Sequence, residues 1–492
     1  MLCFAIVSHY YLGKTVCFPI SSENKEVIYC NNYAPISCKV LIDLELKEII
    51  KIGKEIRDSS DDDDFVIELY NLKEIDISVR KEDPYNRKNM ENLFTLSIDP
   101  LGSKDLDDAL SIDDKKLYIH IADVTSYLKD NDIDNILKRG NTFYLRNSNV
   151  PMLSREFADN IISLLPNSKK RAITLEFNLK NLSLDSCYPS FINNNYQLSY
   201  SDVDNILLGK TENYSDDVIC AVQKLEKCYQ KFKVINRIDV NTISTSHKII
   251  EEFMIHSNKS IAHILDNGLY RHHPIPYTNK AGYLQRFIGY QLNEIIPVEI
   301  ESLKNFVTRL PQKKTIQYLT KHMMSKALYT TKEKSHWALN EEKYTHFTSP
   351  IRRASDIIVH YSLLRNTESI KKKELYIPYL NKGEEIQNNI ESILLELDKR
   401  RNIKCQEYDA CVIKVNTKGI ECYIPKLDTT YSFHISQCSN GEYLEYKNGQ
   451  LTSINYNYYL GKCLKLKLQK FNINSGKMEF NIIGEINQLE LL

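Results

Sequence analysis

Short segments rich in β-branched and aromatic residues occupy both ends of the chain and enclose a longer region of mixed pattern. Near the N-terminus such segments are separated by polar turns, and they cover residues 4–11, 15–20, 26–30 and 38–44. After about residue 405 the same pattern returns at residues 410–415, 419–425, 431–436, 463–471 and 477–484. Short strands at this spacing are typical of small β-barrels, and we predict an OB-type barrel at each end.

Between the two predicted barrels, strand patterns alternate with long amphipathic helices. Residues 216–236 and 247–265 have helical periodicity, and in the second range Ile250, Phe253 and Ile261 recur on one face. The sequence therefore predicts an α+β protein with a central mixed α/β domain. The predicted domains are 1–85, 86–404 and 405–492, and a charged, proline-containing stretch near residue 85 marks the first boundary.

Four acidic residues gather around one glycine between residues 97 and 112. Residues 95–99 have a strand pattern, residues 100–104 form a predicted turn around Gly102, and residues 105–112 resume an alternating pattern. The acids are Asp99, Asp105, Asp107 and Asp108. Carboxylates this close repel one another unless a cation compensates, and oxygen ligands without histidine or cysteine favour magnesium, with manganese possible.

A structural or solvated role for this acidic cluster remains the alternative to a catalytic metal site. A calcium loop of the EF-hand type is not matched, because the alternate acids and the distal glutamate are missing. The run Asp61–Asp64 serves as a contrast, since it follows two serines without apolar interruption and is predicted to be a solvated loop.

A second candidate site lies in residues 344–364. Ser349 is predicted to cap a helix whose first turn holds Pro350, which places Arg352 and Arg353 near the helix N-terminus. Backbone N–H groups and guanidinium groups together suit a phosphate. An ordinary salt bridge from Arg352 to Asp356, four residues later, is the alternative interpretation.

Composition restricts the setting of these candidate sites. Lys plus Arg and Asp plus Glu are 64 each, so a nucleic-acid surface must be a local patch. Twelve cysteines are scattered without metal-binding spacing, which favours a reducing compartment. The sequence has no convincing signal peptide and no apolar run of membrane-spanning length, so we expect no membrane association.

Several long motifs resemble the ribonuclease II and ribonuclease R (RNB) family, which includes the catalytic exosome subunit. SIDPLGSKDLDDAL matches its acidic signature and YTHFTSPIRRASDIIVHY its arginine motif. Matches between them keep the family order, from YIHIADVTSYL through NTFYLRNSNVPMLSREFADNIISLLP, LSYSDV and HKIIEEFMIHSNKSIAHIL to LYRHHPIP. The resemblance covers about residues 90–400. It implies a central catalytic domain between a cold-shock-type barrel, single here, and a C-terminal barrel of the ribosomal-protein type.

The resemblance also implies an activity and residue roles. The family degrades single-stranded RNA from the 3′ end, processively and by hydrolysis, to nucleoside 5′-monophosphates. The four aspartates would bind magnesium, with the residue matching Asp107 critical for turnover, and Arg352 would stabilise charge on the phosphate. The positions expected to contact RNA are Tyr144, Tyr200, Glu251, Glu391 and Arg353. Tyr144 would stack on the 3′-terminal base, whereas Tyr200 fits a core position equally well and Glu391 a solvated helix face.

Two further functions remain as alternatives: a non-catalytic RNA-binding or scaffold protein of the same fold, and a metal-dependent phosphodiesterase acting on DNA or small nucleotides. Beyond RNA, the expectation is a monomer that is able to join an exosome-like complex. The expected location is the cytoplasm, with the nucleus not excluded. Lys462, Lys465, Lys467 and Lys470, beside several aromatic residues, suggest that the C-terminal barrel also contacts RNA.

Overall fold

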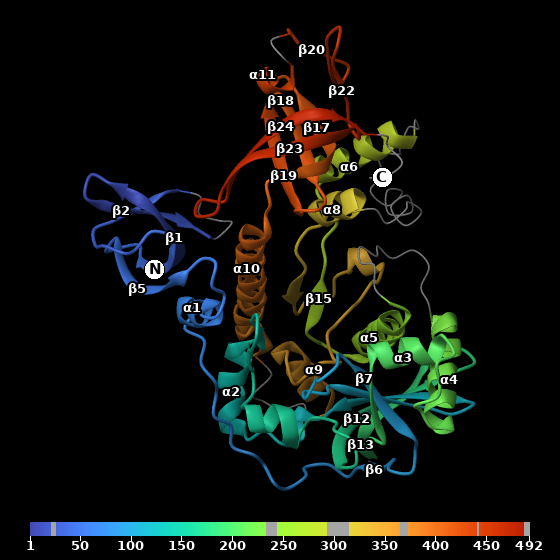
Figure 1. The fold of residues 1–492 in the computed structure, drawn as a ribbon. Coiled ribbons are helices and arrows are strands. Elements are labelled where there is room, and N and C mark those ends of the chain that lie inside the picture. The colour runs from blue at the N-terminus through green and yellow to red at the C-terminus, as the bar shows by residue number, and fades with distance from the viewer. Residues whose placement is uncertain (21–25, 233–243, 293–313, 365–371, 440–441, 487–492) are drawn as a thin grey trace.

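The computed structural model describes residues 1–20, 26–232, 244–292, 314–364, 372–439 and 442–486 of the chain. Two five-stranded sheets flank a central seven-stranded sheet (Figure 1). The long helix α10 (Ile377–Asn402) runs from the central region to the C-terminal sheet, and the N-terminal sheet lies beside it (Figure 1). None of the described helices combines the length and the apolar character that crossing a membrane requires.

The two terminal sheets share one topology. The N-terminal sheet has the order β3-β2-β1-β4-β5, and the C-terminal sheet has the equivalent order β19-β18-β17-β23-β24, with antiparallel pairing throughout. The N-terminal strands are β1 (Leu2–Tyr11), β2 (Lys14–Pro19), β3 (Ile28–Cys30), β4 (Cys38–Asp43) and β5 (Glu48–Glu55). The C-terminal strands are β17 (Glu407–Asn416), β18 (Gly419–Ile424), β19 (Thr429–His434), β23 (Cys463–Asn472) and β24 (Lys477–Glu485). This order is that of an OB fold, so the α+β prediction with flanking OB barrels is confirmed.

The central sheet has the order β14-β7-β8-β9-β12-β13-β6. Its strands are β6 (Lys88–Asn89), β7 (Thr95–Asp99), β8 (Asp108–Ile112), β9 (Lys116–Ala122), β12 (Lys169–Asn178), β13 (Leu184–Asn193) and β14 (Tyr196–Ser199). The two outermost pairs are parallel and the inner pairs are antiparallel. Helices α2 (Asp130–Arg139), α3 (Tyr200–Leu207), α4 (Asp216–Phe232), α5 (Thr245–Ile264) and α9 (Ala354–Leu364) share one hydrophobic core with this sheet.

Smaller elements complete the fold. They are α1 (Asp62–Leu69), α6 (Thr278–Leu292), α8 (Lys314–Met323), α11 (Ile435–Cys438), and the short strands β10 (Phe143–Tyr144), β11 (Asn149–Val150), β15 (Tyr270–His272), β16 (Leu328–Thr330), β20 (Glu445–Lys447), β21 (Gln450–Thr452) and β22 (Asn457–Tyr458). The predicted helices over 216–236 and 247–265 correspond to α4 and α5, with residues 233–236 outside the described part of the chain.

Apolar contacts join both barrels to the rest of the molecule. Phe4 and Leu41 of the N-terminal barrel share a cluster with Ile390 and Leu397 of α10. On the other side, α6 and α8 pack with the C-terminal barrel, where Phe287 and Leu319 adjoin Cys411 and Tyr423. Buried apolar surface therefore fixes the N-terminal barrel to α10 and the C-terminal barrel to α6 and α8.

The acidic run Asp61–Asp64 is not the solvated loop that the sequence pattern predicted. Asp62 begins α1 and is fully buried, and its carboxylate accepts bonds from Lys39 Nζ at 2.8 Å and from Arg401 at 2.6 and 2.8 Å. Arg146 approaches the same carboxylate at 3.1 Å. The prediction was wrong because these three cations come from β4, the loop after β10 and α10, which local sequence does not place.

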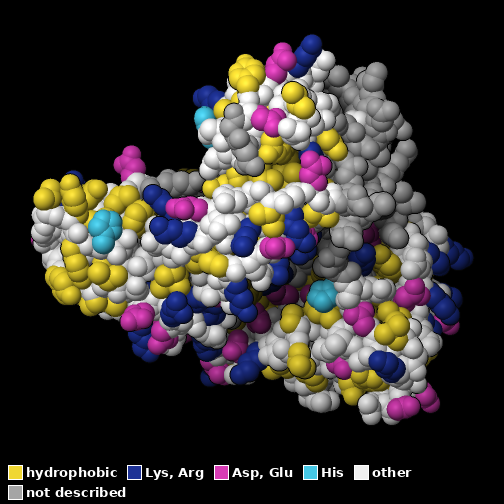
Figure 2. Space-filling view, turned by 45° about the horizontal axis from the view of Figure 1, so that its top comes forward, with side chains coloured by type: hydrophobic (Ala, Val, Ile, Leu, Met, Phe, Trp, Pro, Cys, Tyr) yellow, Lys and Arg dark blue, Asp and Glu magenta, His cyan; other side chains and the backbone are white. Residues whose placement is uncertain are grey.

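The surface shows different side chains on different lobes. Hydrophobic side chains gather over the N-terminal barrel in Figure 2, and Tyr10, Tyr11 and Tyr33 are 41%, 56% and 69% exposed there.

The basic patch expected on the C-terminal barrel is smaller than predicted. Lys462 is buried and paired with Glu485, and Lys465 lies 3.8–3.9 Å from Asp409 and Glu407, whereas Lys467 and Lys470 are exposed.

Candidate active site

A cavity of about 720 Å³ brings the two candidate sites together at one end of the central sheet. Its lining includes the acids Asp99, Asp105, Asp107, Asp108 and Glu251, the aromatic residues Tyr144 and Tyr200, and the arginines Arg352 and Arg353. These residues come from β7, the loop after it, β8, β10, α3, α5 and the segment before α9. Residues about 250 positions apart in the chain thus share one solvent-accessible space.

Local structure fixes the four aspartates in different ways. Asp99 ends β7 and Asp108 begins β8, while Asp105 and Asp107 lie in the connecting loop rather than in a strand. Gly102 has φ +85° in the turn, where Ser103 N donates to Pro100 O at 3.1 Å. The loop is anchored at Asp107, whose carbonyl accepts from Ala122 N at 2.9 Å. The expected alternation of Asp105 and Asp107 along a strand is therefore not formed.

Arg352 reaches the cluster from a turn rather than from a helix. Helix α9 begins at Ala354, so the prediction that Ser349 and Pro350 form its cap and first turn was wrong. Ser349 instead accepts, through its carbonyl, from Arg353 N at 3.0 Å, and its own N–H donates to Asp356 Oδ1 at 2.7 Å. This turn presents the guanidinium of Arg352 to the acids.

Asp107 is the acid that joins the two motifs. Ile351 N donates to its Oδ1 at 2.8 Å and Arg352 Nε donates to its Oδ2 at 3.2 Å. Arg352 Nη2 also donates to Ser349 Oγ at 3.0 Å. The alternative salt bridge from Arg352 to Asp356 is not formed, since Asp356 binds Arg353 Nη2 at 2.8 Å. Asp107 thus orients Arg352, and Asp356 holds the turn that carries it.

Burial raises the pKa of every aspartate in the cluster, and repulsion from neighbouring cluster acids adds to the shift at Asp99 and Asp107. Burial, then the charges of Asp108, Asp107 and Asp105, raise the pKa of Asp99 to about 8. Burial raises the pKa of Asp107 to about 8 and that of Asp108 to about 7, although Arg352 opposes both shifts. The pKa of Asp105 is also raised, mainly by burial. One guanidinium therefore does not compensate this much buried negative charge.

These acids fit a hard divalent cation. Asp99 Oδ2 is buried without a hydrogen-bond partner among the described residues, so one oxygen is available as a ligand. The raised pKa values of these carboxyl groups also indicate that the cluster requires a cation, because a cation favours the ionised form of each carboxyl group. Within the described residues, no three acidic, histidine or cysteine side chains already surround a common point as a formed metal site. Asp107 is the least available ligand, since both of its oxygens accept hydrogen bonds.

The predicted aromatic positions both lie at the cavity. Tyr144 ends β10, its side chain is 40% exposed, and its backbone N–H donates to Gln387 Oε1 on α10 at 2.9 Å. Burial raises the pKa of Tyr144 to about 12. Tyr200 begins α3 and stacks on His247 with ring centroids 3.6 Å apart. Tyr200 thus lines the cavity but already has a ring partner.

The remaining predicted contacts are placed less directly. Glu251 lines the cavity on α5, whereas its neighbour Glu252 is buried and does not. Arg353 lines the cavity but pairs with Asp356, so its main contacts are internal. Glu391 is exposed on α10 and accepts from Gln387 Nε2 at 2.9 Å, outside the cavity lining. This position fits the solvated helix face.

Sequence reasoning missed several polar and aromatic residues of the cavity lining. His247, Asn258, His336, Tyr344 and His346 all line the cavity. Asn258 Nδ2 donates to Tyr344 Oη at 3.0 Å, and burial lowers the pKa of His336 to about 3. All but His336 lie inside motifs that carry the family resemblance, but a single polar residue on a helix or loop gives no local sign that it faces a cavity.

The two OB-type barrels and the acid-and-arginine cavity of the central region define the architecture of an RNB-type protein. The sequence pattern of the RNB domain family matches residues 87–368, more than half of the chain. The chain belongs to this family, which confirms the predicted resemblance.

Known relatives extend the likeness over nearly the whole chain. Ribonuclease R of Thermotoga maritima is 24% identical over 89% of this chain and 72% of its own length. Across eight such relatives, this chain spans between 56% and 72% of their length. Mycoplasma genitalium RNase R, solved with ribose-methylated single-stranded RNA, has a TM-score of 0.76 and 18% identity over 98% of this chain and 90% of its own. Yeast Ssd1, a pseudonuclease, has a TM-score of 0.71 and 17% identity over 92% of this chain and 67% of its own.

Proposed function

We propose that this protein is a hydrolytic 3′→5′ exoribonuclease that degrades single-stranded RNA to nucleoside 5′-monophosphates. The observation that carries the proposal is the approach of Arg352 Nε to Asp107 Oδ2, 3.2 Å apart, inside a cavity lined by the other three aspartates. Phosphodiester hydrolysis needs stabilisation of negative charge and an activated water rather than a protein nucleophile. Membership of the RNB family and the ribonuclease names of its relatives support the same activity.

Each residue of the site would have its own role in RNA hydrolysis. Asp99, Asp105 and Asp108 would hold magnesium, and Asp107 would add to this set while keeping Arg352 in place. When bound, the metal would supply Lewis-acid stabilisation of the phosphate and a water of lowered pKa. Arg352 would bind a non-bridging phosphate oxygen and stabilise the charge that grows on it. Tyr144 would stack on the 3′-terminal base and so align the last phosphodiester with the acids.

Two alternatives share parts of this evidence. A non-catalytic RNA-binding protein is a real alternative, because the fold alone is also that of a pseudonuclease. The complete set of four aspartates with Arg352 favours catalysis over it. A phosphodiesterase acting on DNA or small nucleotides would use the same acids, but Tyr144 and the two barrels favour a polymer with unstacked bases.

One assay separates these functions. Purified protein is incubated with 5′-labelled RNA, with and without magnesium, beside matched DNA and RNA whose 3′ end is blocked. We expect metal-dependent shortening of the open RNA and protection of the blocked RNA and the DNA. Equal attack on DNA, or shortening of the blocked RNA, would reject the exoribonuclease. Binding without any cleavage would support the scaffold alternative.

Several finer properties belong to the proposal. We propose magnesium as the metal, processive action, domain limits at 1–85, 86–404 and 405–492, and RNA contacts on both barrels. The exposed Tyr10, Tyr11 and Tyr33 would provide stacking surfaces on the first barrel. A monomer in the cytoplasm, free or joined to a decay complex, is the expected form, and no disulfide links the residues that the structure describes.

Replacing Tyr144 with Ala is expected to weaken binding of the RNA 3′ end by about 1–3 kcal/mol, because one base loses its stacking partner. The expected measurement is a higher KM on short RNA together with a change in the length of the final product. Tyr144→Phe is the matched control, since it keeps the ring, and it should behave like the wild type. A loss of equal size in Tyr144→Phe would contradict stacking.

Replacing Arg352 with Lys is expected to lower kcat by roughly tenfold to a hundredfold. Lysine keeps the positive charge but loses the planar fork that reaches both Asp107 and a phosphate oxygen. Single-turnover cleavage measures the effect. Arg155→Lys, at an exposed pair with Glu74, should leave the rate unchanged. An unchanged rate in Arg352→Lys would show that charge alone is sufficient.

A further inference from the structure

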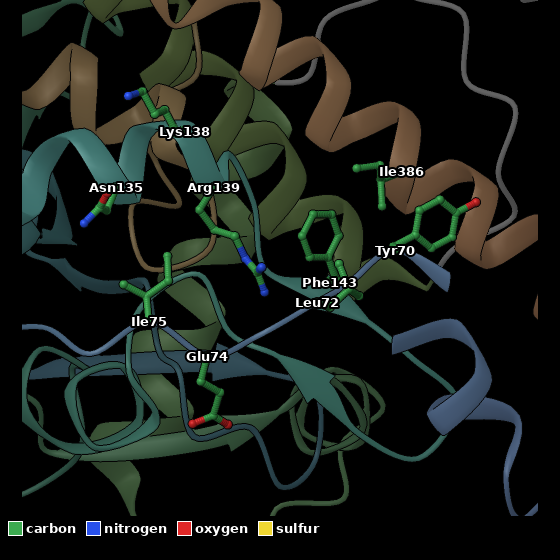
Figure 3. A pocket seen from close by; sticks show the side chains of 9 residues that line it. All are labelled: Tyr70, Leu72, Glu74, Ile75, Asn135, Lys138, Arg139, Phe143 and Ile386. Atoms are coloured by element: carbon green, nitrogen blue, oxygen red, sulfur yellow. The ribbon is translucent and has the colours of Figure 1, made fainter. Parts of the chain in front are cut away.

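A second cavity, of about 490 Å³, is lined by residues around Arg139 and Phe143 (Figure 3). Residues 70–75, the end of α2, Phe143 of β10 and Ile386 of α10 form its walls. Phe143 points into this cavity, whereas the next residue, Tyr144, lines the active site, because successive side chains of a strand face opposite ways. Apart from three charged side chains, the lining is mainly apolar.

Arg139 is the unusual residue of this cavity. It projects from the end of α2 toward Phe143, with Glu74 beyond its tip (Figure 3). Its Nε and Nη2 atoms are both buried and have no hydrogen-bond acceptor among the described residues. Burial lowers the pKa of Arg139 to about 10, and no acidic neighbour in the described part of the chain opposes the shift.

The other charged residues of the cavity already have partners. Lys138 Nζ lies 2.7 Å from Asp134, and Glu74 lies 3.3 Å from Arg155. Among the described residues, Arg139 has only the ring of Phe143, at 4.8 Å from its guanidinium carbon. A ring face attracts a cation but does not replace the hydrogen bonds that two N–H groups lose on burial. The cavity therefore holds one guanidinium whose charge is not matched.

We infer that this cavity is a second phosphate-binding site, with Arg139 as its main ligand. Nε and Nη2 form one edge of the guanidinium, and such an edge binds two oxygens of a phosphate side by side. Lys138, the next residue, already pairs with Asp134 at 2.7 Å, so the guanidinium of Arg139 is the group that an anion would bind. The cavity volume is in the range of small-molecule sites, so the phosphate would carry an organic group, as in a nucleotide.

The site adjoins the segment that holds the catalytic arginine and the stacking tyrosine. Gly140 O accepts from Ala354 N at 2.8 Å, and Thr142 N donates to Arg352 O at 3.0 Å. The phosphate could belong to a free nucleoside monophosphate or to a second nucleotide of an RNA strand, and either source rests on the proposed function. Binding of inorganic phosphate at this site is independent of the proposed function.

Calorimetric titration tests the site in the full chain. Inorganic phosphate and then AMP are titrated in chloride buffer with chelator, in an Arg352→Ala background that removes the phosphate contact of the active site. We expect saturable binding that weakens by at least about tenfold in Arg139→Met, which keeps an unbranched stem against Phe143. Arg80→Met is the matched control, because Arg80 pairs with Asp130 at 3.1 Å outside the cavity, and it should bind as the parent does.

A second measurement needs no variant. Phenylglyoxal modifies accessible arginines, and peptide mass spectrometry follows Arg139 alone. Protection by phosphate or AMP supports the site with a free nucleotide as ligand, and protection only by a 2′-O-methylated RNA supports a phosphate of the strand. The inference would be overturned if no ligand protected Arg139 and the calorimetric titration showed no binding. Phosphate binding in a protein that fails to cleave RNA would reject the proposed function and leave this site standing.

Discussion

Asp108→Asn is expected to reduce kcat for RNA cleavage by about 10³-fold or more while RNA binding persists. The substitution removes one negative charge and one metal-ligating oxygen but keeps the shape of the side chain. Metal ions contribute several kcal/mol of charge stabilisation in the transition state, which corresponds to a factor of this size. Single-turnover cleavage of 5′-labelled RNA gives the rate, and filter binding with the same RNA gives the affinity.

The control for this substitution lies six residues further along the chain. Asp114 is 87% exposed and pairs with Lys224 at 2.7 Å, so Asp114→Asn makes the same chemical change outside the cavity. It should cleave at the wild-type rate. If Asp108→Asn also cleaved at that rate, the assignment of the aspartate cluster as the metal site would be rejected.

Asp62→Asn is expected to lower the free energy of unfolding by about 3–5 kcal/mol, the usual cost of removing one partner from a buried ion pair. Asp62 is buried with Lys39, and it also binds Arg401 of α10 at 2.6 Å. Asparagine keeps the size but leaves these cations without their shared negative charge. Urea unfolding followed by tyrosine fluorescence measures the change. Asp64→Asn, at an exposed position two residues later, should shift stability by no more than about 0.5 kcal/mol.

The same carboxylate predicts a dependence on pH. Burial alone would raise the pKa of Asp62, but hydrogen bonds and charge from Arg401 and Lys39 lower it overall. A group whose pKa is lowered by folding stabilises the folded state above its ordinary pKa and loses this effect as the pH falls through the lowered value. The stability difference between wild type and Asp62→Asn should thus be full at pH 7 and shrink below about pH 4. A difference that grows in acid would contradict this account.

The periodicity of hydrophobic residues was a reliable guide to the elements. Strands with alternating or continuous apolar residues, such as those in 38–44 and 95–99, are strands in the structure, and the apolar stripe through Ile250 and Phe253 faces the central core. These patterns succeed because burial of one face is a local property of a segment. The chemical types in the acidic and arginine motifs were equally readable, since ligands for a metal or a phosphate must be particular residues.

Local rules failed where distant partners decided the outcome. The composition of the run Asp61–Asp64 suggests a solvated loop. Asp62 is nevertheless buried, because its carboxylate forms ion pairs with Lys39, Arg146 and Arg401. Ser349 and Pro350 look like a helix start, but the helix begins only at Ala354, and Ile351 N and Arg352 Nε donate to the distant Asp107. In both cases a charged side chain found its partner through tertiary packing, and no window of neighbouring residues contains that information.

By itself, the sequence determined most of the elements, the two barrels and the residues able to perform phosphate chemistry. Apolar periodicity and ligand type can both be recognised within a short segment of sequence. Only the tertiary structure decided that Asp107 holds Arg352, that Tyr144 and Tyr200 face one cavity while Glu391 lies outside it, and that Arg139 faces another. These outcomes depend on how the sheet, α10 and the turn before α9 pack against one another. The packing of these three elements depends on contacts between residues that lie hundreds of positions apart in the chain.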